Sequence, residues 1–134
     1  KKLKKEAGSK DIELRYIGNI RLSKSDKIIL NLDGRDKVLD EFCDFIKMMG
    51  DIGIPYNGIT FEPTRVWSSG RIEHRSCSAR YVDFNEMAKR PFTHEREYKY
   101  DEVFDNFCYM MDRVLPAAQK NNVKIGSSKK EHIK

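Results

Sequence analysis

Two segments with helical periodicity, each followed by a short apolar run, constrain the fold of this chain more than any other feature. Residues 36–50 and 101–121 place apolar side chains at steps of three and four, which lines one face of an α-helix. Residues 54–61 and 123–125 follow them and read as short strands. Strands that alternate with helices are typical of parallel sheets with right-handed crossovers.

The N-terminal part extends the same order. Residues 1–7 resemble the end of a helix that stops at Gly8, and residues 12–17 alternate as a strand does. Residues 18–35 are rich in turn formers and are expected to be irregular. We therefore expect at least three parallel strands. The apolar faces of the two long helices should bury five side chains, which are Phe42, Ile46, Phe104, Phe107 and Val114.

Length limits how much of a large α/β fold is present. The 134 residues suffice for one domain, which we assign to residues 1–126, with a basic tail at 127–134. A closed (β/α)8 barrel needs about 250 residues, so the expected fold class is α/β, a partial barrel with parallel strands and a long βα loop. The chain lacks an initiator Met and is expected to be a processed, truncated or partial product.

Charge and cysteine content narrow the function classes. The net charge is +5, but the excess lysines gather at the two ends, which favours solvated termini over a nucleic-acid surface. No apolar run approaches the ~20 residues of a membrane span, and no signal peptide is recognisable. The odd set Cys43, Cys77 and Cys108 contains no CxxC pair, which favours a reducing compartment. Cys43 and Cys108 are expected to be buried thiols on helices.

Most motifs that carry recognisable chemistry are absent. The sequence has no Walker loop, GxGxxG, HExxH or GxSxG motif. His74, His94 and His132 have no partner at metal-ligand spacing and are expected to be surface histidines. Three loop carboxylates, Glu62, Glu73 and Asp83, could serve as acids or bases, and are expected to be ordinary loop carboxylates. No metal ligand and no catalytic residue is assigned from these patterns.

The long loop at residues 62–99 is the most suggestive segment, because it follows the end of a strand. Loops of this length in compact domains are usually functional or disordered. Within it, residues 80–84 have the composition of a short strand. Planar guanidinium groups beside an indole ring are suited to binding a sugar acid. Solvated arginines with a Trp that packs on the helices are an equally good interpretation of the same loop. The residues concerned are Arg65, Trp67, Arg71, Arg75 and Arg80.

Several short segments, in order, resemble the mannonate dehydratase family. Lys-Lys-Glu-Ala-Gly at residues 4–8, before Ile-Glu-Leu at 12–14, resembles its helix end and next strand. Gly-Arg-Asp at residues 34–36 resembles the entry to its next helix. Gly-Ile, Phe-x-Pro and Trp within residues 53–67 resemble a Gly-Ile…Asn-Phe-Met-Pro…Trp segment. Val-Leu-Pro-Ala-Ala at 114–118 resembles its Val-Leu-Pro-Val-Ala.

This resemblance implies a xylose-isomerase-like barrel that converts D-mannonate to 2-keto-3-deoxygluconate with Mn²⁺ or a similar divalent ion, in the cytoplasm. Where the family has His-Pro-Asp-Asp-Pro, with a metal-binding His, this chain has Gly-Ser-Ser-Lys at residues 126–129. The family's Asn-Phe-Met-Pro is Thr-Phe-Glu-Pro at residues 60–63. We therefore carry over no metal ligand. The expected substrate-binding residues are Arg65, Trp67 and Arg75.

Two other classes of protein remain open. A basic α/β module could bind nucleic acid or a protein partner, although no RNP, KH or helix-turn-helix signature supports nucleic acid. A half-barrel could instead bury its open edge by forming a homo-oligomer. Steep salt dependence of polynucleotide binding would favour the first of these alternatives.

Overall fold

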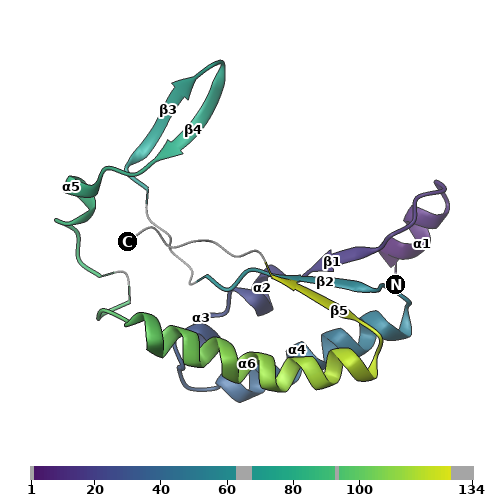
Figure 1. Cartoon of the computed structure of the whole chain (residues 1–134). Helices are drawn as coiled ribbons and strands as arrows, with labels where there is room; N and C mark the ends of the chain where they lie inside the picture. Colours follow the sequence, from purple (N-terminus) through teal and green to yellow (C-terminus); the bar gives the residue numbers. More distant parts are fainter. Residues whose placement is uncertain (1, 63–67, 93, 128–134) are drawn as a thin grey trace.

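A computed structural model describes residues 2–62, 68–92 and 94–127 (Figure 1). The fold is mixed α/β, as the alternation of patterns predicts. The helices are α1 (Lys2–Gly8), α2 (Ile20–Ser23), α3 (Asp26–Ile29), α4 (Arg35–Asp51), α5 (Phe84–Met87) and α6 (Tyr100–Lys120). The strands are β1 (Tyr16–Gly18), β2 (Tyr56–Ile59), β3 (Gly70–His74), β4 (Cys77–Tyr81) and β5 (Lys124–Ser127).

Strands β1, β2 and β5 form one parallel sheet in the order β1-β2-β5. The register places Tyr56 of β2 opposite both Tyr16 and Lys124. The expectation of three parallel strands is therefore confirmed. β1 contains only the last two residues of the expected segment 12–17 and extends to Gly18, and β2 is shorter than 54–61, because only these residues pair in the sheet.

The core lies between this sheet and helices α4 and α6, which cover one of its faces (Figure 1). Phe42, Ile46 and Val114 are fully buried, as their helical spacing predicts. The prediction for Phe104 is wrong: its side chain is 48 % exposed and stacks on Tyr100 of the preceding turn. Phe107 is only partly buried and packs at the margin of the core. Side chains at the edge of an apolar helix face remain in solvent when nothing covers that edge.

The two long helices approach closely at one end and are joined by polar contacts at the other. A Cβ on Gly50 of α4 would lie 2.6 Å from the carbonyl oxygen of Asn121, so only glycine fits this approach without movement. Near the start of α4, the Tyr109 hydroxyl donates to Asp36 at 2.8 Å. Arg113 donates to Asp40 at 2.6 Å. These contacts fix the two helices side by side beneath the sheet.

The segment 18–35, expected to be irregular, contains two short helices. The side chain of Asn19 accepts a hydrogen bond from the backbone N–H of Leu22 and caps α2. Helices α2 and α3 and the residue that follows α3 bring four apolar side chains into the interior, namely Leu22, Ile28, Ile29 and Leu30. Four-residue helices are too short to show a helical period, which explains why the sequence pattern missed them.

The long loop contains an antiparallel hairpin, so the expectation of an irregular segment is wrong for residues 70–81. β3 and β4 pair from Gly70–Tyr81 at the base to His74–Cys77 at the tip. Arg75 and Ser76 both have positive φ, the conformation of a type I′ hairpin turn. Asp83 then caps the short helix α5 by accepting from the backbone N–H groups of Asn85 and Glu86.

All three cysteines are free thiols, in line with the absence of a disulfide framework. Cys43 is half-buried and lies 3.6 Å from the carbonyl oxygen of Arg113. Burial raises the pKa of the Cys43 thiol, so less of it is thiolate at a given pH. Cys108 is exposed, which corrects the expectation that it is buried.

Phe42 and Phe104 provide a test of how the helix faces are oriented. Phe42→Ala should lower the free energy of unfolding by about 3–5 kcal/mol, because it leaves a cavity in the core. Phe104→Ala removes an exposed ring and should cost less than about 1 kcal/mol. Urea denaturation of the two variants measures both values. Equal losses would contradict the burial assigned to these two helices.

Candidate functional site

The carboxyl ends of the three parallel strands lie together at one edge of the sheet (Figure 1). Ligand and catalytic groups in α/β proteins gather at this edge, because loops from several strands converge there. Asn19 follows β1, and the segment from Thr60 to Glu62 follows β2. The site is therefore built from the residues that leave the strand ends and from the segments that pack against them.

A half-buried ion pair joins two of these segments. Lys24, at the end of α2, lies 3.3 Å from Glu62, and their side chains are 29 % and 12 % exposed. Beside Glu62, the ring of Phe61 meets the ring of Phe107 edge to face at 5.1 Å. A carboxylate held in such surroundings needs its cation, since burial penalises an unpaired charge. The sequence alone classed Glu62 as an ordinary loop carboxylate.

A second polar contact anchors the segment that returns from the hairpin. The Nε2 atom of His94 lies 3.4 Å from Asp26 of α3, and the His94 side chain is 15 % exposed. The expectation that His94 is a surface histidine is therefore wrong. His94 and Asp26 are far apart in the sequence, so no local spacing could have paired them.

The same returning segment is held at the start of α6 by Arg96. Its guanidinium hydrogen-bonds to Glu102 and lies 3.8 Å from the centre of the Tyr98 ring. This hydrogen bond lowers the pKa of the Glu102 carboxyl. The contribution of Glu102 to stability is therefore present above the ordinary glutamate pKa and is lost as the pH falls through the lowered value.

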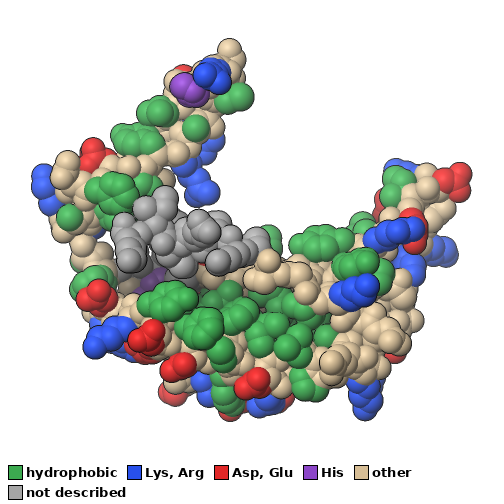
Figure 2. Space-filling model, in the orientation of Figure 1, with side chains coloured by type: hydrophobic (Ala, Val, Ile, Leu, Met, Phe, Trp, Pro, Cys, Tyr) green, Lys and Arg blue, Asp and Glu red, His purple; other side chains and the backbone are tan. Residues whose placement is uncertain are grey.

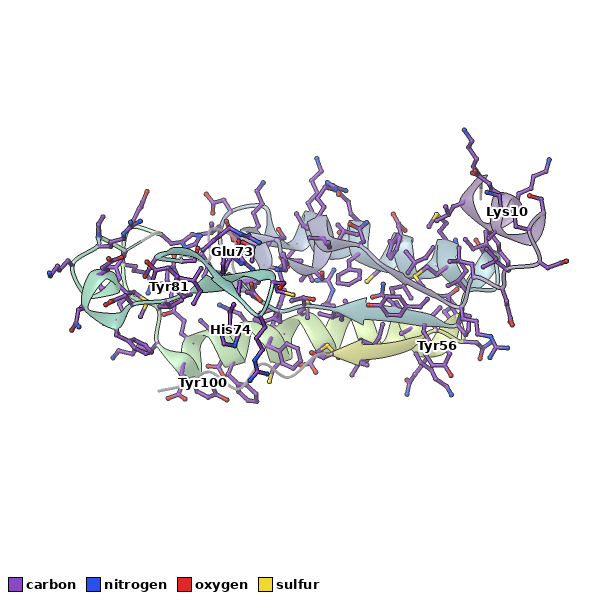
Figure 3. The ribbon with its side chains drawn as sticks, turned by 90° about the horizontal axis from the view of Figure 1, so that it is seen from above. Lys10, Tyr56, Glu73, His74, Tyr81 and Tyr100 are labelled. Carbon is purple, nitrogen blue, oxygen red and sulfur yellow. The ribbon has the colours of Figure 1, made fainter. Side chains whose placement is uncertain are left out.

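The face of the sheet opposite the helices is open and carries two rows of in-register residues (Figure 3). One row is Tyr16, Tyr56 and Lys124, and the Lys124 ammonium lies 5.5 Å from the centre of the Tyr56 ring. The next row toward the carboxyl ends is Gly18, Gly58 and Gly126. The Tyr16 ring lies over Gly58, since its hydroxyl oxygen occupies the space of a Cβ there.

Of the three residues expected to bind substrate, the structure describes only Arg75. Arg75 lies at the turn of the β3–β4 hairpin and is exposed. Arg65 and Trp67 lie outside the described residues. Arg71 and Arg80 lie on the strands of the same hairpin. The hairpin stands above the carboxyl ends of the parallel strands, on the side of the open face (Figure 1).

The donor set of the described residues does not fit a metal ion. Within residues 2–62, 68–92 and 94–127, no three His, Cys, Asp or Glu side chains cluster as a metal site requires. The manganese ion that the resemblance implies therefore has no ligand set in this part of the chain. Within the same residues, no helix is both long enough and apolar enough to cross a membrane.

Comparison with solved structures finds a similar fold in mannonate dehydratase from Streptococcus suis serotype 2. The TM-score is 0.76, at 19 % sequence identity. The match covers 94 % of this chain and 39 % of the dehydratase chain, so this chain corresponds to part of a larger enzyme. No family model matches the chain, and no curated protein matches it in sequence. At 19 % identity this likeness shows the fold and does not by itself show the activity.

The Lys24–Glu62 pair should contribute measurably to stability. A double-mutant cycle with Lys24→Met and Glu62→Gln should give a coupling energy of about 1–2 kcal/mol, because the pair is shielded from water. The exposed pair Arg21–Glu41, at 3.0 Å, is the matched control and should couple by less than about 0.5 kcal/mol. Chemical denaturation of the single and double variants provides both energies. Similar coupling in the two pairs would show that the first is solvated.

Proposed function

We propose that this chain forms part of a carbohydrate hydro-lyase that removes water from a sugar acid, D-mannonate, to give 2-keto-3-deoxygluconate. The observation that carries the proposal is the likeness of 94 % of the chain to part of a mannonate dehydratase. The order of the short segments at residues 4–14, 34–36, 53–67 and 114–118 supports it independently. The likeness in fold and the order of the segments each support the proposal.

The proposed reaction breaks a C–H bond beside the carboxylate and a C–O bond on the neighbouring carbon. The released proton and hydroxide form water, and the resulting enol becomes the keto acid. A divalent ion such as Mn²⁺ would stabilise the negative charge that develops on the substrate. Since the described residues do not supply its ligands, we assign no step of the reaction to a group of this chain.

We assign the role of this chain to substrate binding. Arg65, Trp67 and Arg75 belong to the long segment that follows β2 in the sequence. Guanidinium groups bind carboxylates through paired hydrogen bonds, and an indole ring packs on the apolar face of a sugar. The half-buried Lys24–Glu62 pair, at the start of this segment, gives it a fixed origin on the sheet.

Turnover of D-mannonate tests the reaction. The full product of the gene that encodes this chain should form keto acid in the presence of Mn²⁺, at an ordinary enzyme rate on the order of 1–10³ per second. The 134-residue chain alone should show little or no turnover, because its described residues lack the ligands of a metal site. Absence of keto acid from the full product, with mannonate and with related sugar acids, would contradict the proposal.

The substrate-binding assignment has its own test in the same enzyme. Trp67→Ala should raise the KM for D-mannonate about tenfold while kcat changes less, because it removes a contact made equally to substrate and transition state. Steady-state kinetics of the variant and of the exposed-helix control Lys47→Gln provide the comparison. An unchanged KM for Trp67→Ala would remove Trp67 from the binding site.

A further inference from the structure

Two arginines lie directly opposite each other on the β3–β4 hairpin. Arg71 of β3 pairs in register with Arg80 of β4, and both residues are exposed. Like charges in directly opposite positions destabilise a strand pair. The hairpin therefore carries a local electrostatic cost that an anion between the two side chains would remove.

Contacts within the hairpin hold one of the two guanidinium groups in place. The Nε atom of Arg71 donates to the Ser78 hydroxyl at 3.0 Å, and its Nη2 atom donates to the Ser78 carbonyl oxygen at 3.1 Å. These two bonds leave Nη1 for an external acceptor. Neither Arg71 nor Arg80 forms an ion pair with the described residues, and Glu73 on the same face lies beyond ion-pair distance of both.

The two arginines lie on a hairpin that projects on the side of the sheet's open face (Figure 1). Figure 2 shows Lys and Arg side chains along the flank of the hairpin that is turned toward the open face. Arg71 and Arg80 are the basic residues of β3 and β4. Among the described residues the two strands pack mainly on each other, and a two-stranded hairpin without a supporting layer is marginally stable.

We propose that Arg71 and Arg80 form an oxyanion-binding pair that receives the carboxylate of the substrate. A carboxylate between them can accept paired hydrogen bonds from the planar guanidinium of Arg80 and a hydrogen bond from Nη1 of Arg71. The inference rests on the proposed function for the identity of the ligand as a sugar acid. The residues themselves are identified by their register, their charge and the absence of a carboxylate partner among the described residues.

Titration of the 134-residue chain with small ligands tests the pair directly. The probes are D-mannonate, D-gluconate, inorganic phosphate and the uncharged polyol mannitol, followed through the side-chain Nε–H signals of arginine in NMR spectra. Both sugar acids should shift the Arg71 and Arg80 signals, and mannitol should not. The double variant Arg71→Gln/Arg80→Gln should bind the acids at least about tenfold more weakly, since hydrogen bonds to charged groups are lost.

A charge-matched variant separates a specific site from general attraction to a basic protein. Lys37→Gln/Lys47→Gln removes the same charge from exposed positions on α4 and should change affinity less than about twofold. Three outcomes would overturn the proposal: equal weakening of binding in both double variants, no binding of either sugar acid, or tighter binding of phosphate than of the sugar acids. Binding of both acids through Arg71 and Arg80 would support the oxyanion-binding pair. If the full gene product then failed to dehydrate D-mannonate, that failure would refute the proposed reaction and leave the binding pair intact.

Discussion

Burial of one face of the parallel sheet under α4 and α6 is the interaction on which the rest of this structure depends. Parallel strands pair only when a crossover returns the chain to the same end of the sheet. Each crossover here carries a long helix, whose apolar residues, such as Phe42 and Val114, meet the sheet. This packing brings the carboxyl ends of β1, β2 and β5 together and so creates the edge at which the functional groups gather.

The sequence predicted the parts of the fold that have a long and regular pattern. Residues 36–50 and 101–121 differ from α4 and α6 by one residue at each end, and the three parallel strands were identified in order. The short helices α2 and α3 were missed because four residues do not complete a recognisable period. Phe104 was wrongly predicted to be buried. A helical pattern shows which side of a helix is apolar, but it does not show how much of that side other elements cover.

The site was less predictable than the fold, because its contacts join residues that are remote in the sequence. The chain itself gave no sign that Glu62 meets Lys24 or that His94 meets Asp26. Arginines in the long loop were noticed by composition, yet their arrangement depends on the register of a hairpin that was not predicted. Of the residues assigned to substrate binding, Arg75 lies at the hairpin turn, while Arg65 and Trp67 lie outside the described residues.

The hairpin also has a consequence for the order of folding. Its strands are neighbours in the sequence, so the entropy lost on closing their turn is small, and hairpins form within about 1–10 μs. The parallel sheet must instead join segments separated by whole helices, which slows its formation. Since β3 and β4 pack mainly on each other, they can open and reclose while the sheet and its two helices remain folded. Their backbone amides should therefore exchange with solvent earlier than those of β2.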